Sequence, residues 1–434
     1  MKSRYALNVD PKCCNERVLN DCHQMYTDSD RGLITIAQSV GMTLLPPRKK
    51  ITVMLIGGHS VGKSSFINWY VEEHIQKPGG AIGTHGFTFV TSGCKRTSLT
   101  GKATFQLYPQ FKQFQKVKGV SEYISTEICT SRQKQFSLVT FVDTPGLVDG
   151  DMKYPFDVDQ TILQLGDVCD LILVFFDPIG QALCKRTLNI VEQLKVKHGD
   201  RVNFYLSKAD EARGESDRQK AMMQIAQELG IHDFDMPTIY IPNPNKPSRC
   251  VNQIEEVCHT IQKTIDQTVQ NTLNTLGKDC EVICEAVIDT LNNDRLCYKE
   301  NSSVCNLSCA LTLLGFSVML LFILFISNIY WEFLVVLLSA YGIETLLLYL
   351  DPFMRALDSL PMQIQLIICG FLMQLSVILH ILAYLLFNSK PTLSGKQKIE
   401  LQEKLEYVQE MVKPKKKKLH VIYHQQSIGD QDTD

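Results

Sequence analysis

Two features that would point to secretion or to nucleic-acid binding are missing from this sequence. The N-terminal residues contain no apolar run of the kind that a secretory signal peptide needs, and their acidic residues argue against a transit peptide. The 44 lysine and arginine residues are balanced by 46 aspartate and glutamate residues, which gives a formal net charge of -2. Such a balance gives no ground for a protein that binds nucleic acid through bulk positive charge. We therefore expect a non-exported N-terminal part and no nucleic-acid partner.

The cysteines lack the spacing of a disulfide framework. There are 15 of them, an odd number, and they are scattered without the paired CxxC motifs of a zinc site. This usage favours a reducing, cytosolic compartment. Two N-x-S sequons, at Asn301 and Asn306, would matter only if that stretch faced a lumen.

Short apolar runs alternate with helix-length segments between Ile51 and Pro242. The runs are rich in Val, Ile, Leu and Phe, and helical crossovers join them. This pattern is typical of a mainly parallel sheet that is covered on both faces, so the sequence predicts a doubly wound α/β fold. The predicted strands are ITVMLIG, SLVTFVD, DLILVFFD, VNFYL and TIYIPN.

Apolar residues then recur every three or four positions from Val251 to about Leu291, which predicts an amphipathic helix. We expect Gly277 to break this helix in two. The pattern lacks the sustained e/g charge pairing of a coiled coil, which favours a helical stalk that packs back on the α/β domain.

Two long apolar segments follow the stalk. Asn306 to Trp331 carries no charge, and Pro361 to Asn388 carries none apart from a neutral His380. Each exceeds the roughly 20 residues that span a bilayer, and neither has a polar face to present to water. Both are predicted to be transmembrane helices.

A third apolar segment, Phe333 to Leu350, is ambiguous because Glu344 interrupts it. A carboxylate at the bilayer centre costs about 2.5 to 3.5 kcal/mol, which the surrounding leucines could offset. Basic residues flank both ends of the membrane region, so both ends should be cytosolic and the number of crossings even. We favour a hairpin whose middle segment is re-entrant or interfacial, and three full spans are the alternative.

The C-terminal tail contains a run of basic residues: Lys413, Lys415, Lys416, Lys417 and Lys418. One interpretation is a solvated tail that begins with a short surface helix. The other is attraction to anionic lipid of the cytoplasmic leaflet, at roughly 1 kcal/mol per basic residue near the surface.

The 434 residues are thus expected to form five parts. They are a partly helical N-terminal segment (1–50), an α/β domain (51–245), a helical stalk (246–300), a membrane region (301–390) and a tail with the lysine run (391–434). This organisation predicts an integral protein of an intracellular membrane, with the α/β domain and the tail in the cytosol.

The segment Gly57 to Ser64 fits the pattern G-x-x-x-x-G-K-[ST], between a predicted strand and a predicted helix, as a P-loop requires. In such a loop the glycines let backbone N–H groups surround the phosphates, the lysine reaches the β and γ oxygens, and the hydroxyl binds Mg²⁺. Lys63 and Ser64 are the residues for these last two roles. The candidate nucleotide-binding residues here are Gly57, Gly58, His59, Ser60, Val61, Gly62, Lys63, Ser64 and Ser65.

Two further motifs follow at the ends of predicted strands. Asp143-Thr144-Pro145-Gly146 supplies a carboxylate for the outer shell of Mg²⁺ and, at Gly146, an N–H for the γ-phosphate. Ser207-Lys208-Ala209-Asp210 is similar to the N-K-x-D box, in which the aspartate accepts two hydrogen bonds from guanine. Either motif alone is weak evidence for a nucleotide site. Because both follow a P-loop in the expected order, the three motifs together are a specific indication of one.

The three motifs together resemble those of the dynamin-superfamily GTPases, and most of all the branch of the EH-domain ATPases and sarcalumenin. The resemblance covers about Ile51 to Pro242. It implies hydrolysis of GTP to GDP and phosphate, a nucleotide-dependent homodimer or oligomer, and a role in remodelling or tethering membranes. No EH domain is visible, and the membrane segments in its place are closer to the tail-anchored fusion GTPases.

The resemblance also implies site residues outside the P-loop. In that branch a switch threonine follows an isoleucine-glycine pair, here Ile82-Gly83, so that Thr88 is the first choice and Thr84 the second. The implied magnesium site is Ser64, Thr88 and Asp143. The implied catalytic residues are Lys63, Ser60, Thr88 and His59.

Two departures from the pattern leave the activity open. His59 stands where dynamin-like proteins often have glutamine, and Ser207 replaces the asparagine of the third box. The branch also includes enzymes that prefer ATP, so ATP remains possible beside GTP. The alternatives are an ATP-preferring NTPase and a slow-turnover, nucleotide-gated scaffold that recruits partners. A transporter or channel would rest on Glu344 alone.

Overall fold

The computed structural model describes residues 11–75, 86–108, 111, 114, 117–131, 133–149, 154, 156–179, 184–230, 236–243, 245, 248–329 and 359–431. The chain divides into two compact units. The first comprises Met1–Val282 and Tyr407–Asp434, and the second comprises Ile283–Glu406.

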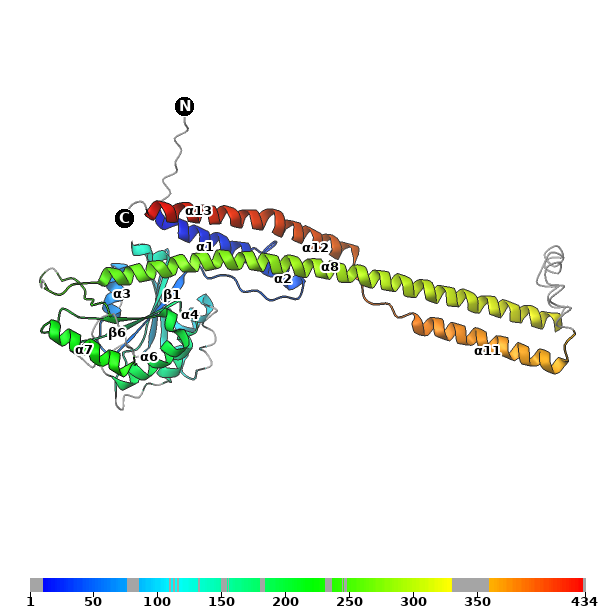
Figure 1. Cartoon of the computed structure of the whole chain (residues 1–434), viewed down its shortest axis with the longest axis horizontal. Coiled ribbons are helices and arrows are strands. Elements are labelled where there is room, and N and C mark those ends of the chain that lie inside the picture. The colour runs from blue at the N-terminus through cyan, green and yellow to red at the C-terminus, as the bar shows by residue number, and fades with distance from the viewer. Residues whose placement is uncertain are drawn as a thin grey trace, which may run out of the picture. The chain divides into compact units, whose positions relative to one another are not determined.

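A seven-stranded mixed sheet forms the centre of the first unit (Figure 1), with the strand order β3-β4-β2-β5-β1-β6-β7. Its strands are β1 (Ile51–Gly57), β2 (Phe87–Ser92), β3 (Thr97–Thr100), β4 (Ile124–Cys129), β5 (Val139–Asp143), β6 (Leu171–Phe176) and β7 (Val202–Leu206). Strand β1 pairs in parallel with β5 and β6, as do β6 with β7 and β2 with β4, whereas β2–β5 and β3–β4 are antiparallel. The predicted α/β fold with a mainly parallel sheet is confirmed.

The central strands are largely apolar because helices cover both faces of the sheet, and every residue of β1 and β6 is buried. One face packs against α5 (Val158–Gly166) and α6 (Lys185–His198), where Ile162 and Leu194 share a core with Ile172 of β6. On the other face, Phe66 of α3 (Lys63–Val71) meets Phe141 of β5 and Phe175 of β6 edge-on. Two further helices, α4 (Gly101–Leu107) and α7 (Glu215–Glu228), complete the layers.

Four of the five predicted strands are confirmed, and the fifth is wrong. The run TIYIPN forms only an isolated bridge between Thr238 and Leu206, because Pro237 and Pro242 on either side lack the N–H that a ladder requires. Strands β2, β3 and β4 were not predicted. Strand β3 is largely exposed and β4 alternates buried with half-buried residues, so neither presents a continuous apolar run.

A bundle of helices lies beside the sheet in the first unit (Figure 1). It consists of α1 (Pro11–Thr27), α2 (Leu33–Ser39), the first part of α8 (Ile254–Ile329) and α13 (Lys413–Gln431). The Asn15 amide donates to Asp266 Oδ1 at 2.9 Å, and the Tyr423 hydroxyl donates to Asp266 O at 3.1 Å. The stalk stripe of α8 is fully buried and consists of Val257, Ile261, Ile265, Val269, Leu273 and Leu276.

Helix α8 runs through Gly277 without a break, so the expected interruption there is wrong. Glycine costs about 1 kcal/mol relative to alanine inside a helix, and the buried residues on both sides, Leu276 and Cys280, outweigh that cost. The glycine also makes room for a neighbour, because a Cβ at position 277 would collide with Nζ of Lys416 from α13.

The lysine run is helical. A π-helical turn, η5 (Val408–Val412), comes immediately before α13, whose second residue is Pro414. Proline removes a backbone donor and crowds the preceding turn, and a widened turn accommodates both effects. Lys413 and Lys416 are half-buried in the bundle, whereas Lys415, Lys417 and Lys418 are exposed.

The second unit is a helical hairpin built from the rest of α8 and α11 (Met362–Leu386), which lie side by side (Figure 1), followed by α12 (Gly395–Tyr407). The Ser308 hydroxyl donates to Ala383 O and the Ser376 hydroxyl donates to Gly315 O, both at 3.0 Å. Both helices are long and apolar enough to cross a membrane, and only 17% and 11% of their most apolar windows are buried. Both predicted apolar helices are confirmed as helices, and the ambiguous segment Phe333 to Leu350, with Glu344, lies outside the described residues.

Polar contacts at the open end of the hairpin hold the chain that follows α11. Asn301 pairs with the backbone of Lys390 through two hydrogen bonds of 2.8 and 2.9 Å. Lys390 Nζ also lies 2.6 Å from a carboxylate oxygen of Glu300. Asp294 accepts from the Leu393 N–H and from Lys398 Nζ, each at 2.6 Å. Charged groups thus gather at this end, whereas no charged residue occurs between Asn301 and Ile329.

Candidate functional site

The P-loop connects β1 to α3, as predicted. Gly62 adopts the left-handed conformation (φ 98°) directly before the first residue of α3, where a side chain would be strained. Ser60 is also left-handed, with φ 61°. This turn directs the free backbone N–H groups at the N-terminus of α3 toward the loop, which is the arrangement that binds phosphate.

Lys63 is buried beneath the loop. Its Nζ donates to Gly57 O at 3.2 Å and to Gly58 O at 3.0 Å. Burial lowers the pKa of Lys63 to about 8, and the nearby charge of Asp143 offsets only part of that effect. An ammonium group held by two neutral carbonyls is an incompletely neutralised cation, so it suits an anionic ligand.

Asp143, at the end of β5, is fully buried beside Ser64. The Ser64 hydroxyl donates to Asp143 Oδ2 at 2.5 Å, whereas Asp143 Oδ1 has no hydrogen-bond partner among the described residues. Burial raises the pKa of the Asp143 carboxyl. An unpaired buried carboxylate oxygen is costly, and oxygen ligands next to a phosphate loop are those that Mg²⁺ prefers. The residues present therefore fit a magnesium ion.

The loop after β5 is joined to the P-loop through backbone contacts. The His59 N–H donates to Leu147 O at 3.1 Å, and the Leu147 N–H donates to Gly57 O at 3.2 Å. Gly146 lies so close that a Cβ there would clash with the His59 backbone. Only glycine fits at position 146, so the second motif lies against the first.

Thr88 lies within strand β2, where it pairs with Asp143 of β5. Its Oγ1 accepts a hydrogen bond from the Ser125 hydroxyl at 3.4 Å, and Thr88 as a whole is 9% exposed. It is therefore a strand residue rather than a loop residue. The second choice, Thr84, and the pair Ile82-Gly83 lie outside the described residues.

His59 and Ser60 are exposed on the P-loop. The Ser60 hydroxyl and the His59 Nδ1 lie 2.8 Å apart, so that the two side chains interact with each other. Both side chains are accessible from the solvent side of the loop.

The third motif meets the P-loop through Ser207. The Ser207 hydroxyl donates to the Val61 carbonyl at 2.7 Å, and the same hydroxyl approaches Phe176 O at 3.0 Å. Ser207 is 4% exposed, so its side chain supports the P-loop from beneath rather than facing a ligand. Lys208 is left-handed (φ 51°), and its Nζ lies 3.7 Å from Asp177 Oδ2.

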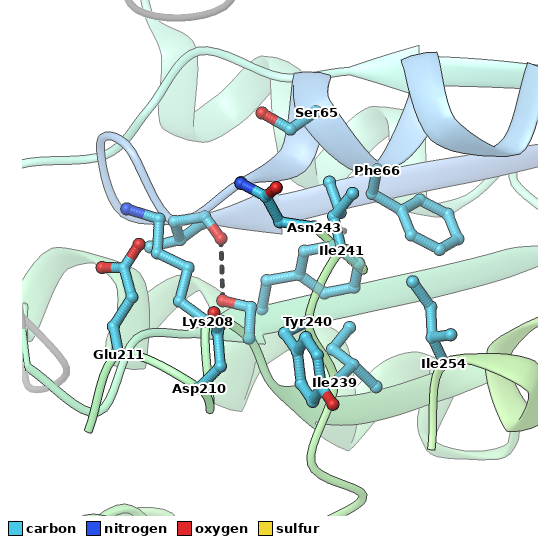
Figure 2. A pocket seen from close by; sticks show the side chains of 14 residues that line it. Ser65, Phe66, Lys208, Asp210, Glu211, Ile239, Tyr240, Ile241, Asn243 and Ile254 are labelled. Atoms are coloured by element: carbon cyan, nitrogen blue, oxygen red, sulfur yellow. Dashed lines mark hydrogen bonds between the residues drawn. The ribbon is translucent and has the colours of Figure 1, made fainter. Parts of the chain in front are cut away.

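A pocket of about 280 Å³ opens between α3 and the third motif (Figure 2). Of the predicted site residues it brings together Val61, Gly62, Ser65, Ser207, Lys208 and Asp210. Sequence reasoning missed the rest of its wall, which includes Phe66, Phe175, Glu211, Ile239, Tyr240, Ile241, Asn243 and Ile254. The run TIYIPN was noticed, but as a strand, and instead it passes along this pocket.

The wall of the pocket is tied to the start of the stalk. The Tyr240 N–H donates to Asn252 Oδ1 at 3.1 Å, and Asn252 Nδ2 donates to Tyr240 O at 2.9 Å. Ile254, the first residue of α8, lines the pocket itself. The Tyr205 hydroxyl of β7 lies 3.2 Å from the Thr260 hydroxyl of α8.

Comparison with known proteins gives matches over this domain. Residues 52–208 match the family described as 50S ribosome-binding GTPase. EH domain-containing protein 1 of Arabidopsis thaliana is 29% identical over 172 residues, which are 37% of this chain and 30% of that protein. EH domain-containing protein 3 of Homo sapiens is 25% identical over 171 residues, 37% of this chain and 31% of that protein. The match thus spans less than a third of the length of these relatives.

Among solved structures, an oligomerised bacterial dynamin pair is similar at a TM-score of 0.41 and 14% identity, over 92% of this chain and 79% of that chain. The sequence matches and the converging motifs agree with each other: residues 52–208 form a P-loop GTPase domain, and this domain is of the dynamin-superfamily type, with relatives among the EH-domain-containing proteins.

Proposed function

We propose that this chain is a membrane-anchored, dynamin-like GTPase that hydrolyses GTP to GDP and phosphate and uses the cycle to remodel or tether an intracellular membrane. The observation that carries the proposal is the convergence of three loops, after β1, β5 and β7, on one edge of the sheet, with an open pocket beside the P-loop. In open α/β sheets ligands bind at the carboxyl ends of the strands, which is where these loops lie.

At the phosphate end, Lys63 supplies a fixed positive charge and the N-terminus of α3 supplies backbone donors. Ser64 and the unpaired oxygen of Asp143 are the residues that would hold Mg²⁺, the serine directly and the carboxylate through water, with Thr88 or Thr84 as a third. Magnesium bound there would neutralise charge on the phosphate oxygens.

At the base end, Asp210 is the residue that distinguishes guanine from adenine. A carboxylate accepts hydrogen bonds from the N1–H and the amine of guanine but faces a lone pair on N1 of adenine. Asp210 and Lys208 both line the pocket, which supports GTP as the substrate. The Ser207 hydroxyl is bonded to the P-loop at Val61. Replacement of the asparagine of the N-K-x-D box by serine therefore affects the position of the P-loop more than the contacts to the base.

The link to the membrane rests on the second unit. Its two apolar helices expose most of their side chains, and their interhelical hydrogen bonds from Ser308 and Ser376 are of the kind that joins helices in lipid. The charged end of the hairpin would lie at the cytosolic surface, with the GTPase domain and the tail on the same side. The exposed lysines 415, 417 and 418 could then attract anionic headgroups.

The nucleotide cycle would reach the stalk through the wall of the pocket. Tyr240 is bonded to Asn252 and Ile254 begins α8, so a change in the pocket on hydrolysis would act directly on the start of that helix. A nucleotide-dependent homodimer or oligomer would convert such movements into work on a membrane. The alternative is a slow-turnover, nucleotide-gated scaffold, which would fit His59 in the place of the glutamine that dynamin-like proteins often have, with its imidazole directed to the Ser60 hydroxyl.

The test is nucleotide binding and turnover by the full chain in detergent, with GTP and ATP and with or without Mg²⁺. Lys63→Ala should abolish binding or hydrolysis without unfolding the protein, since the hydrogen bonds that Nζ makes to described residues go to the loop carbonyls of Gly57 and Gly58. Lys49→Ala, at an exposed lysine on the preceding segment, is the matched control and should behave like wild type.

Three outcomes would contradict parts of the proposal. Wild-type affinity in folded Lys63→Ala would refute the phosphate site. Tighter binding of ATP than GTP would favour the ATP-preferring alternative. Binding of GTP with no turnover in multiple-turnover or single-turnover assays would favour the scaffold.

A further inference from the structure

A tyrosine outside the three motifs contacts the second motif. The Tyr154 hydroxyl donates to Gly146 O at 2.6 Å, at the short end of the usual range for hydroxyl donors. Tyr154 is half-buried, and it follows Gly146 by eight residues in the chain. Gly146 is the residue whose N–H we expect at the γ-phosphate of a bound nucleotide. Tyr154 can therefore act on the candidate site through Gly146 without belonging to any of the motifs.

The peptide between Gly146 and Leu147 is held at both of its polar groups. Its carbonyl oxygen accepts from Tyr154, and its N–H, which belongs to Leu147, donates to Gly57 O of the P-loop at 3.2 Å. In a trans peptide these two groups point in opposite directions, so the peptide is fixed between Tyr154 and the P-loop. Residue 146 has no side chain of its own to restrict rotation, because a Cβ would collide with the His59 backbone. The Tyr154 hydroxyl supplies the restraint on the carbonyl side that glycine lacks.

Tyr154 is in turn held by the start of α6. The Arg186 guanidinium lies over the Tyr154 ring, 5.0 Å from its centroid, and Arg186 Nε donates to Asp159 Oδ1 at 2.8 Å. Asp149, three residues after Gly146, accepts from the Lys185 N–H at 2.9 Å and from the Arg186 N–H at 3.0 Å. The hydrogen bond from the Arg186 N–H lowers the pKa of Asp149, so its carboxylate stays charged at neutral pH. The first residues of α6 thus hold both Tyr154 and the loop that follows the second motif.

We propose that Tyr154 is a positioning residue for the γ-phosphate. By fixing the carbonyl of Gly146, its hydroxyl orients the neighbouring peptide, whose N–H is the group expected at the terminal phosphate of GTP. The two peptides are joined through the Gly146 Cα alone, and that atom lies against the His59 backbone, so holding one limits the rotation of the other.

The inference rests on the proposed GTPase function and names a residue by which that site distinguishes GTP from GDP. GDP lacks only the γ-phosphate, so a residue that acts through the Gly146 N–H should affect the binding of GTP and leave the binding of GDP unchanged. A residue that only stabilises the fold of the domain would affect both nucleotides together.

The experiment compares two tyrosine-to-phenylalanine variants of the full chain in detergent with Mg²⁺ present. Fluorescently labelled GDP is bound first and then displaced by unlabelled GTPγS or unlabelled GDP, which gives the ratio of the two dissociation constants for each protein. Tyr154→Phe keeps the ring beneath Arg186 and removes only the hydroxyl. Tyr123→Phe is the matched control, because Tyr123 is also half-buried and packs on Phe156 in the same core, directly before β4.

Loss of one neutral hydrogen bond corresponds to about two-fold to ten-fold in affinity. In Tyr154→Phe the affinity for GTPγS relative to GDP should therefore fall by about that factor, with GDP affinity unchanged, and in Tyr123→Phe the ratio should equal that of wild type. Binding of GDP by Tyr154→Phe also shows that the variant is folded.

The other outcomes separate the two levels of the proposal. If wild type binds both nucleotides and Tyr154→Phe keeps the wild-type ratio, Tyr154 does not position the γ-phosphate contact, and the GTPase site stands without it. An equal loss of affinity for GTPγS and GDP in Tyr154→Phe would likewise overturn the positioning role, because it would show a general effect on the domain. A wild-type chain that binds neither nucleotide would overturn the GTPase site itself, and this inference with it.

Discussion

The two parts of helix α8 differ in what covers their apolar residues. In the first unit the stalk stripe is fully buried, with exposed polar residues on the other side of the helix. In the second unit the apolar residues go all the way round, and Leu313, Phe316 and Leu320 are more than half exposed. One continuous helix thus changes from an amphipathic surface that needs a protein partner to an apolar surface that needs lipid.

The bundle of the first unit and the hairpin of the second unit also differ in their polar contacts. In the bundle, side chains reach across to carboxylates such as Asp266 and Asp279, which remain half-exposed to water. In the hairpin, hydroxyl groups donate to backbone carbonyls of the neighbouring helix instead. A charged partner would be costly in hydrocarbon, whereas a hydroxyl bonded to a carbonyl leaves no unpaired group.

The largest expected effect is on the free energy of unfolding, which should depend on the buried stalk stripe of α8 and not on its exposed apolar residues. Leu273→Ala should lower the free energy of unfolding of the first unit by about 2 to 5 kcal/mol, because it leaves a cavity in a fully buried position. Leu313→Ala, at a residue 70% exposed, should change it by less than about 0.5 kcal/mol. Urea denaturation of the full chain in detergent, followed by Trp69 fluorescence in a Trp331→Phe background, measures both. Equal effects of the two variants would contradict the difference between the two parts of α8.

The second prediction tests whether the exposed residues of the hairpin contact lipid or water. Leu320→Arg should impair membrane insertion, since arginine at the centre of a spanning helix costs about 2.5 to 3.5 kcal/mol. The control is Val196→Arg on α6, where the residue is 85% exposed and a charge should change stability by less than about 0.5 kcal/mol. The fraction of protein that resists alkaline carbonate is the measurement. If Leu320→Arg inserts as fully as wild type, this face of α8 does not contact hydrocarbon.

Much of this organisation could be predicted from the sequence, for a physical reason that differs from one element to another. Strands β1 and β6 are buried on both faces, so their sequences are continuous apolar runs. The P-loop could be recognised because its glycines, lysine and hydroxyl residue are adjacent in the chain. Strands β3 and β4 were missed because the edge strand β3 is largely exposed and its neighbour β4 mixes buried with half-buried residues, so neither has a comparable apolar run.

The pocket between α3 and the third motif could be predicted only in part. Asp210 could be proposed from a local motif, but Tyr240 and Asn243 reach the pocket only because the segment after α7 passes beside it and is bonded to Asn252. The packing of the N- and C-terminal helices against the stalk was likewise not predicted, since the partners are about 250 residues apart in the case of Asn15 and Asp266. A chain cut near residue 300 would therefore lose α13 from the bundle of the first unit.

The third prediction concerns the serine that replaces asparagine in the third motif. Ser207→Ala removes a hydroxyl that donates to the Val61 carbonyl and leaves that buried acceptor weakly satisfied. A neutral hydrogen bond is worth about 0.5 to 1.5 kcal/mol, so nucleotide affinity should fall by about two-fold to ten-fold with little change in base preference. Asp210→Asn should do the reverse and erode the preference for GTP over ATP. Competition titrations with labelled GTP and ATP distinguish the two, and a loss of base preference in Ser207→Ala would show that the serine contacts the base.

The smallest expected effect tests how α13 packs on the stalk. Alanine is favoured over glycine inside a helix by about 1 kcal/mol, so Gly277→Ala would ordinarily stabilise α8. Here the new Cβ would meet the end of the Lys416 side chain, which is flexible and can move away, so we expect the gain and the cost to cancel to within about 0.5 kcal/mol. In a Lys416→Ala background the clash is absent, and the same substitution should stabilise the first unit by about 1 kcal/mol. A double-mutant cycle of urea denaturation gives the coupling between the two residues, and a coupling of zero would place Lys416 away from Gly277 and α13 in a different register on the stalk.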